Sequence, residues 1–303
     1  MLTENTLVFC RPGHEGTADK IAAGLGCGRG EVTFHTFPDG ESYVRLDSDV
    51  RGKRLIMVCG LDHPDRKIMG LIYFCHVARE MSAASIILVA PYLGYMRQDV
   101  RFKAGEAVTS KIFAGLLSGI IDGLVTVDPH LHRYHSLDEI YSAPSRVLHA
   151  TGLISRWIRR NITRPVLIGP DEESEQWVRQ VAEKADAPYM ILRKIRRGDR
   201  EIEVSVPEVE KYRDCIPVLV DDIISTARTM IGTVAHLQKA GMQAPVCIGA
   251  HAIFAGDAYA QLRAAGVARV VTCDSIRHES NEIPLGDLIA EQLSRDLATG
   301  YFR

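Results

Sequence analysis

Short apolar runs alternate with amphipathic stretches of helical length along this chain, and the order of these segments occurs twice. Residues 55–94 align without a gap on residues 217–256. A second alignment sets the segment that begins at Leu7 beside the one that begins at Leu167. Each repeat contains an apolar run, a polar turn, an amphipathic helix and a second apolar run, which is the pattern of a strand–helix–strand unit.

The apolar runs have the composition of strands that are buried on both faces. Residues 85–91 and 217–221 are rich in β-branched side chains without polar alternation, which is typical of parallel sheets covered by helices. In the helix expected over 229–237, Met230 and Val234 lie on one apolar stripe. The pattern predicts an α/β protein with two tandem domains, each a mainly parallel, doubly wound sheet flanked by helices.

The repeat also predicts where the chain divides. A Pro- and Ser-containing stretch at 142–147 is the expected junction, so we expect one domain over residues 1–145 and another over 146–303. No low-complexity linker separates them, and we expect the last ~15 residues to pack on the first domain.

Ligands of doubly wound sheets bind beyond the carboxyl ends of the strands, so the residues after each apolar run are candidates for function. After the run at 217–220 come Asp221 and Asp222, then Ser225, Thr226 and Thr229 at the expected start of a helix. Hydroxyls and backbone N–H groups at a helix start suit a phosphate, and two carboxylates can accept hydrogen bonds from vicinal hydroxyls or hold a divalent cation. The segment predicts a sugar-phosphate site; the alternative is a Ser/Thr helix cap with incidental acids.

Composition and charge restrict the classes of partner. The 303 residues include 36 Lys and Arg against 38 Asp and Glu, for a net charge of -2, with 46% apolar and 24% charged residues. This balance indicates a soluble globular protein and argues against duplex nucleic acid or an anionic membrane surface as partner. An anionic ligand must therefore be held by cations gathered locally.

Cysteine usage and the N-terminal residues suggest a location. The seven cysteines are dispersed and form no C-x-x-C pair, which is typical of reduced thiols rather than a disulfide or metal framework. The first residues lack the features of a signal peptide, and no apolar run approaches the roughly 18 residues needed to span a bilayer. We expect a cytoplasmic protein.

The acidic segment carries a family resemblance. Val-Asp-Asp-Ile-Ile-Ser-Thr at 220–226 resembles the ribose 5-phosphate loop of the phosphoribosyltransferase-like fold, which phosphoribosyltransferases and phosphoribosyl diphosphate synthetases share. Further segments, in the same order, resemble the ribose-phosphate diphosphokinase family over nearly the whole chain: FPDGESYVRL at 37–46, PYLGYMRQDVRF at 91–102, GEAVTSKIFAGLL at 105–117, TVDPHLH at 126–132 and GPDEES at 169–174. That family is built from two phosphoribosyltransferase-like halves, which accounts for the repeat.

The resemblance implies an ATP site made by two segments. Its members here are Phe37, Asp39, Gly40, Glu41, Arg97 and Gln98. An aromatic ring can stack on a purine, a guanidinium can clamp a phosphate and an amide can read polar groups of the nucleotide. Without the resemblance, the first segment is more typical of a β-turn before a strand at 42–46, and Arg97 is equally typical of a surface ion pair with Asp99.

The resemblance also implies the cofactor Mg²⁺, with His130 and Asp171 as its ligands. His130 follows the apolar run at 124–127, and Asp171 follows the run that ends near Gly169. Because magnesium prefers oxygen to nitrogen, we expect His130 to act partly through water. A structural histidine is the alternative role for His130; His132 and His135 have no assigned role.

A cationic run matches the mobile catalytic loop of the family. Residues 193–200 contain five Lys and Arg side chains and one Gly, a composition also typical of a solvated hairpin tip. The resemblance identifies Lys194 and Arg196 as the residues that stabilise the negative charge of diphosphoryl transfer, a reaction that depends mainly on positioning and electrostatics. A loop of this kind could also close over the substrates and exclude water.

The ribose 5-phosphate site implied by the resemblance comprises Arg196, Asp221, Asp222, Ser225, Thr226, Ala227, Arg228 and Thr229. Two of these positions depart from the usual loop, because Ser225 replaces an Asp and Arg228 replaces a Gly. If the loop needs a positive φ at 228, the arginine there is strained. In the first half Cys59 and Gly60 replace the acidic pair, so we expect only the second half to hold ribose phosphate.

The resulting hypothesis is an enzyme that transfers the diphosphoryl group of ATP to the 1-hydroxyl of ribose 5-phosphate, giving phosphoribosyl diphosphate and AMP. A phosphoribosyltransferase and a non-catalytic regulatory homologue are the alternatives. From the resemblance we expect ATP and ribose 5-phosphate as partners and a homo-oligomer based on dimers, a tetramer or a hexamer, since sites of this family are completed across subunits.

Overall fold

The chain divides into two compact units. The structure is a computed structural model that describes residues 5–131, 133–169, 174–197, 201–205 and 209–302, with the backbone alone over 193–197, 201–205 and 209. The first unit comprises Met1–Leu148 and Pro284–Arg303, and the second comprises His149–Ile283. The division after Leu148 lies three residues beyond the expected boundary at 145, which falls inside a strand, β8 (Ser145–Leu148).

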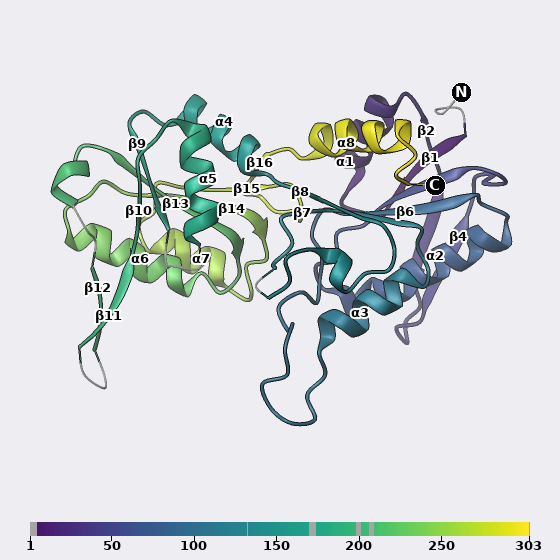
Figure 1. Cartoon of the computed structure of the whole chain (residues 1–303), viewed down its shortest axis with the longest axis horizontal. Helices are drawn as coiled ribbons and strands as arrows, with labels where there is room; N and C mark the ends of the chain where they lie inside the picture. Colours follow the sequence, from purple (N-terminus) through teal and green to yellow (C-terminus); the bar gives the residue numbers. More distant parts are fainter. Residues whose placement is uncertain (1–4, 132, 170–173, 198–200, 206–208, 303) are drawn as a thin grey trace. The chain divides into compact units, whose positions relative to one another are not determined.

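In the described residues, the first unit contains a sheet of six parallel strands in the order β2-β1-β5-β6-β7-β8. Its strands are β1 (Thr6–Cys10), β2 (Gly28–Arg29), β5 (Arg54–Val58), β6 (Ser85–Ala90), β7 (Gly123–Val127) and β8. Helices α1 (Glu15–Leu25) and α8 (Gly286–Ala298) lie on one side of this sheet, and α2 (Ile68–Glu80) and α3 (Thr109–Ser118) on the other (Figure 1). Every residue of β6 and β7 is buried, because helices cover both faces.

The second unit, as far as it is described, has the same architecture. Its six parallel strands follow the order β10-β9-β13-β14-β15-β16. They are β9 (Pro165–Gly169), β10 (Tyr189–Ile191), β13 (Ile216–Ile224), β14 (Val246–Ala252), β15 (Arg269–Cys273) and β16 (Asn281–Ile283). Figure 1 shows α4 (Thr151–Asn161) and α5 (Glu175–Ala185) on one side and α6 (Arg228–Lys239) and α7 (Ala258–Ala264) on the other. In α6 the stripe that includes Met230 and Val234 is buried, as predicted.

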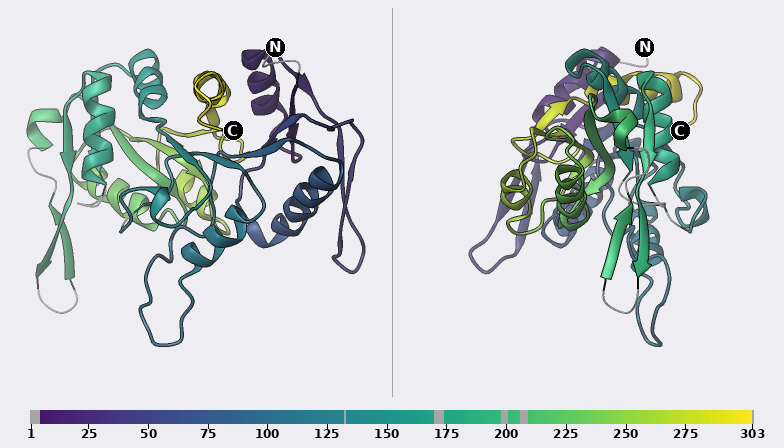
Figure 2. Two further views of the ribbon diagram at one scale, coloured as in Figure 1. Left: turned by 45° about the vertical axis from the view of Figure 1, so that its right-hand side comes forward. Right: turned by 90° about the vertical axis from the view of Figure 1, so that its left-hand side faces the viewer.

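The two units repeat each other element by element, which confirms the predicted fold. The aligned segments 55–94 and 217–256 contain corresponding elements, since β5, α2 and β6 match β13, α6 and β14. Each unit also carries an antiparallel hairpin before the third strand of its sheet: β3 (Val32–Thr36) with β4 (Ser42–Leu46), and β11 (Arg193–Arg197) with β12 (Glu201–Ser205). Both hairpins extend beyond the sheet of their own unit (Figure 2). The predicted ATP segment at 37–41 and the predicted catalytic run thus belong to equivalent hairpins.

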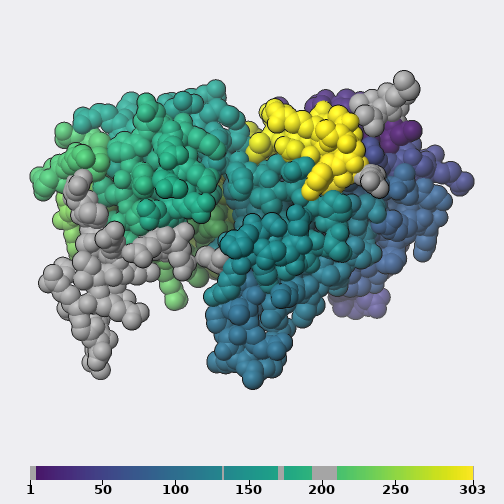
Figure 3. Space-filling model, in the orientation of Figure 1, coloured from purple at the N-terminus to yellow at the C-terminus, as the bar shows by residue number. Residues whose placement is uncertain are grey.

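The C-terminal segment completes the first unit rather than the second. Helix α8 packs closely on α1, where a Cβ at Gly24 would lie 2.7 Å from the Cβ of Ala290. Phe302 is buried, and the hydroxyl of Tyr301 donates to the carbonyl of Ser145 at 2.8 Å. In the space-filling view, the outer side of this segment, in yellow, is visible on the surface of the face shown (Figure 3).

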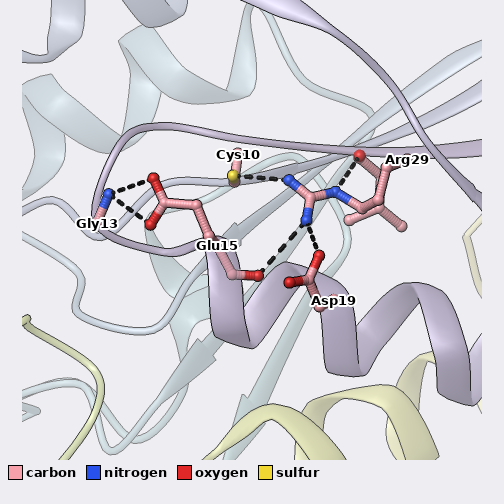
Figure 4. Close-up of polar contacts among 6 residues, drawn as sticks. Cys10, Gly13, Glu15, Asp19 and Arg29 are labelled. Carbon is pink, nitrogen blue, oxygen red and sulfur yellow. Dashed lines mark hydrogen bonds and ion pairs between the residues drawn. The ribbon is translucent and has the colours of Figure 1, made fainter.

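One arginine fastens the short edge strand β2 to the helix beside it. The guanidinium of Arg29 donates to the carbonyl of Val8 at 3.0 Å and to the Sγ of Cys10 at 2.9 Å, and it pairs with Asp19 of α1 (Figure 4). At the start of α1, the carboxylate of Glu15 accepts from the backbone N–H of Gly13 at 3.0 Å. These contacts hold the loop between β1 and α1 at the carboxyl edge of the first sheet.

Among the residues that the structure describes, no helix combines the length and the apolar character that crossing a membrane requires.

Candidate functional site

The predicted acidic pair lies in the last part of β13, at the carboxyl edge of the second sheet. Asp221 and Asp222 are half-buried, and the Oδ1 of Asp221 accepts from the backbone N–H of Asp222 at 3.0 Å. The expectation that the strand ends at this pair was wrong, because β13 stays paired with β14 as far as Ile224. On its other side, within the described residues, the pairing with β9 runs as far as Leu219. The acidic pair therefore lies beyond the described pairing with β9.

The loop after β13 turns directly into α6. Ala227 is the N-cap residue, has a left-handed backbone with φ 56° and is buried, and the helix begins at Arg228 with no side-chain cap. The alternative of a Ser/Thr cap is thus not supported, because the N-cap residue has no polar side chain. The left-handed position of this loop is Ala227 and not Arg228, which is exposed. An N-terminus without a side-chain cap suits an anion.

The strained backbone at Ala227 leads to a stability prediction. Because a left-handed conformation costs a residue with a Cβ about 1–2 kcal/mol and costs glycine almost nothing, Ala227→Gly should raise the free energy of unfolding. After the greater entropy of glycine in the unfolded chain is subtracted, we expect a gain of roughly 0.5–1 kcal/mol in urea denaturation. The matched control is Ala240→Gly at the other end of α6, where φ is -78°. This control should lose stability, and an equal loss in both variants would contradict the prediction.

The segment after β14 supports the loop, and the sequence interpretation did not single it out. The backbone N–H of Phe254 donates to the carbonyl of Ile224, and that of Ala255 to the carbonyl of Ser225, both at 3.0 Å. The ring of Phe254 packs against Tyr259 and His278, at centroid distances of 5.1 and 4.6 Å. Phe254 follows a buried strand by two residues, so the rule that directed attention to Asp221 could also have found it.

The corresponding edge of the first sheet is occupied by the chain's own side chains. Cys59 is fully buried, and burial raises its pKa to about 11, so its thiol is neutral. The backbone N–H of Gly60 donates to the Nε2 of His14 at 3.0 Å. The Nζ of Lys67 donates to the carbonyl of Gly60 at 2.8 Å and pairs with Asp62 at 2.5 Å. The edge that carries the acidic loop in the second unit therefore carries, in the first unit, a half-buried lysine that is ion-paired to a half-buried aspartate.

Burial of His14 predicts a dependence of stability on pH. Desolvation lowers the pKa of His14 from 6.5 to about 4, so the folded state holds the ring neutral while the unfolded state binds a proton. Stability from this group is present above pH 6.5 and is lost as the pH falls toward 4. Between pH 7 and pH 5 we expect a loss of about 2 kcal/mol in the free energy of unfolding. His14→Gln should remove this slope, whereas His76→Gln, at an exposed position of α2, should keep it; equal slopes in all three proteins would disprove the assignment.

The predicted adenine-binding segment forms the exposed tip of the hairpin β3–β4. The backbone N–H of Phe37 donates to the carbonyl of Glu41 at 2.8 Å, and Gly40 closes the turn with φ 94°. Asp39 and Glu41 are exposed, and Phe37 keeps 44% of its surface exposed beside the ring of Tyr43. The turn is the β-turn that local sequence favoured, and its aromatic face is available to a ligand.

The second ATP segment follows β6. Arg97 is exposed and Gln98 is half-buried. Asp99, the suggested partner of Arg97, is buried and pairs with Arg133, whose Nη1 lies 2.6 Å from its Oδ1. Arg133 was not singled out from the sequence, because nothing local relates it to a residue 34 positions earlier.

The structure describes only some of the predicted metal ligands and catalytic cations. His130 is half-buried two residues after Asp128, which itself has a positive φ of 36° at the end of β7. Asp171 lies outside the described residues, and so does His132. Lys194 and Arg196 occupy alternate positions of β11, opposite Val204 and Ile202 of β12. Within the described ranges no three His, Cys, Asp or Glu residues are grouped as metal ligands.

Comparison with known proteins identifies the family. A model of the N-terminal domain of ribose phosphate pyrophosphokinase matches residues 6–120, and a phosphoribosyl transferase domain model matches residues 136–288. The ribose-phosphate pyrophosphokinase of Methanothermobacter thermautotrophicus is 33% identical over 263 residues, covering 86% of this chain and 90% of the relative. The chain belongs to the ribose-phosphate pyrophosphokinase family. The enzyme of Saccharolobus solfataricus is 31% identical, over 84% of this chain and 87% of its own.

Membership of the ribose-phosphate pyrophosphokinase family confirms the resemblance inferred from the motifs. A solved structure of phosphoribosylpyrophosphate synthetase from Mycobacterium smegmatis has a TM-score of 0.83 to this chain, at 22% identity, and the match covers 98% of this chain and 100% of that one. The fold is therefore shared over nearly the whole chain, including both halves.

Proposed function

We propose that this protein transfers the β,γ-diphosphoryl group of ATP to the 1-hydroxyl of ribose 5-phosphate, giving 5-phosphoribosyl 1-diphosphate, AMP and a proton. The observation that carries the proposal is the edge of the second sheet, where two half-buried carboxylates precede a helix without a side-chain cap. That arrangement suits a ligand with hydroxyls at one end and a phosphate at the other. Family membership over both halves of the chain supports the same reaction.

Ribose 5-phosphate is held by the loop after β13. Asp221 and Asp222 accept hydrogen bonds from the ribose hydroxyls or hold their cation, and the phosphate binds at the start of α6. The phosphate-binding residues are Ser225, Thr226, Ala227, Arg228 and Thr229, with Arg196 as a further cation. Because Arg228 is exposed at the first helical position, its guanidinium can add a charge-assisted contact to the phosphate.

ATP is held by the two segments of the first unit. Phe37 stacks on the adenine, and its exposed ring supports this role. Asp39, Gly40 and Glu41 line the same turn, while Arg97 and Gln98 contact the phosphates and the nucleotide. We further propose that the protein works as a homo-oligomer, because the nucleotide segment forms the exposed tip of a hairpin.

The reaction needs cations that stabilise the charge on the transferred phosphate oxygens, and it needs no covalent intermediate with the protein. The 1-hydroxyl oxygen attacks the β-phosphorus, the bond from that phosphorus to the α,β-bridging oxygen breaks, and AMP leaves. Lys194 and Arg196 stabilise the charge that develops on the transferred oxygens. Mg²⁺, when bound, neutralises the phosphate oxygens; the carboxylate oxygens of Asp221 and Asp222 are ligands of the type it prefers, and His130 and Asp171 are the further candidates.

The test is an assay of AMP release that requires ribose 5-phosphate, coupled to an independent measurement of phosphoribosyl diphosphate. We expect both products in equal amounts and only when both substrates are present. A phosphoribosyltransferase would instead consume phosphoribosyl diphosphate with a nucleobase, without ATP. A regulatory homologue would bind the substrates and release neither product, and either result would reject the proposal.

A further inference from the structure

Asp99 is a buried carboxylate that follows β6, and its one described ion pair is with Arg133, which follows β7. Its side chain is 2% exposed, and its Oδ1 accepts from the Nη1 of Arg133 at 2.6 Å. Its Oδ2 is buried and has no hydrogen-bond partner among the residues that the structure describes. Burial of a carboxylate with one unsatisfied oxygen destabilises the fold, so a hydrophobic residue would serve packing better. A role in function would explain the acid at this position.

The backbone around Asp99 is held from two further sides. The hydroxyl of Tyr134 donates to the carbonyl of Asp99 at 3.1 Å and lies 3.3 Å from the Oγ of Ser110. The backbone N–H of Ser110 donates to the carbonyl of Gln98 at 3.2 Å. Three elements therefore meet at this point: the segment after β6, the segment after β7 and the first turn of α3.

The residues that meet here are direct neighbours of the nucleotide-binding residues. Arg97 and Gln98 immediately precede Asp99, and His130 precedes Arg133 by three residues. Arg133 is fixed on its other side by the ring of Phe102, whose centroid lies 5.7 Å from its guanidinium carbon. The ion pair thus joins the segment proposed to bind ATP to the segment proposed to bind its metal.

We propose that Asp99 and Arg133 are positioning residues, which hold Arg97 and Gln98 in register with His130 so that the magnesium–ATP complex binds. The inference rests on the proposed function for the identity of the nucleotide. Neither residue contacts substrate. Their effect is on nucleotide affinity, and ribose 5-phosphate, bound at the other unit's loop, is unaffected.

The first unit offers a matched control in a second buried acid–arginine pair. Asp296 of α8 is 4% exposed in its side chain and accepts from Arg146 of β8 at 2.7 and 3.0 Å. It belongs to the packing of the C-terminal segment and adjoins no predicted ligand residue. Asp99→Asn and Asp296→Asn remove the same charge from the same kind of pair, so they separate positioning from stability.

The experiment measures KM for ATP, KM for ribose 5-phosphate and the Kd of magnesium–ATP by calorimetry. We expect Asp99→Asn to raise the KM and Kd for ATP at least about tenfold with KM for ribose 5-phosphate unchanged, while Asp296→Asn changes neither and lowers only Tm. Arg133→Gln, at a side chain that is 53% exposed, should reproduce the ATP effect even if Asp99→Asn does not fold. Unchanged ATP binding in Arg133→Gln, or a parallel rise in both KM values, would overturn the proposal.

The calorimetric measurement separates this inference from the proposed function. If the wild-type protein binds magnesium–ATP but releases no AMP, the proposed function fails and the Kd values still decide the role of the ion pair. If the wild-type protein is active and the variants bind ATP normally, the positioning role alone fails. If the wild-type protein does not bind ATP, both are rejected.

Discussion

Replacement of Lys194 by alanine is expected to lower kcat about a thousandfold and to leave KM for ATP and for ribose 5-phosphate within about threefold of wild type. The reason is that diphosphoryl transfer concentrates negative charge on the transferred oxygens only as the reaction proceeds. A cation directed at those oxygens therefore stabilises the transition state more than either bound substrate. Lys194 belongs to the hairpin β11–β12, which is the equivalent in the second unit of the hairpin β3–β4, for which we propose nucleotide binding.

The same strand provides the control for this prediction. Lys194 and Arg196 occupy one alternating set of positions in β11, and Arg193 and Arg197 occupy the other; successive positions of a strand belong to opposite faces. Arg193→Ala removes the same amount of charge from the same strand and should lower kcat less than about threefold. An equal loss in the two variants would show that the run acts only through its total charge. A loss of substrate binding in Lys194→Ala, without a loss of kcat, would also contradict the assigned role.

Asp222→Asn is expected to lower kcat/KM for ribose 5-phosphate about a hundredfold, because it should weaken the proposed charge-assisted contact to the sugar or its cation, worth roughly 2–3 kcal/mol. KM for ATP should change less than about threefold. Asp222 is a better probe than Asp221, whose Oδ1 also accepts a backbone hydrogen bond within the strand. Steady-state kinetics with each substrate varied in turn, together with calorimetric titration of ribose 5-phosphate, measures the effect.

The control for Asp222 lies just before the other end of the same strand. Asp214 precedes β13, is 80% exposed and lies 3.7 Å from Arg164 in an exposed ion pair. Asp214→Asn should leave both KM values and kcat unchanged, because an exposed pair far from the carboxyl edge contributes little. A similar loss in both variants would mean that β13 needs negative charge for folding rather than for sugar binding.

Candidate site residues can be proposed from the sequence because the patterns that mark them are local. Asp221 and Asp222 follow a buried apolar run, Phe37 precedes a turn, and Lys194 lies in a dense cationic run, so apolar runs and family motifs both point to them. The supporting residues could not be found this way. Arg133 and Phe254 act through partners that are distant in sequence, and only the folded chain brings each pair together.

The position of the strained backbone also could not be predicted from the sequence. The sequence drew attention to Arg228, because an arginine replaces a glycine there, whereas the left-handed residue is Ala227. The residue of a tight loop that takes the positive φ depends on where the strand before it ends and where the helix after it begins. Here β13 stays paired with β14 as far as Ile224, so only the three residues 225–227 connect it to α6, and Ala227 takes the positive φ.

By itself the sequence determined that one α/β unit occurs twice, and it predicted a sugar-phosphate site at the polar edge of the second copy and a changed edge in the first. It could do so because apolar periodicity and strand-end chemistry are short-range properties. Only the tertiary structure decided that the segment from Pro284 onward belongs to the first unit, that Lys67 fills the changed edge and that Asp99 pairs with Arg133. These outcomes depend on which distant surfaces fit, such as α8 against Gly24 of α1, and no local pattern encodes that fit.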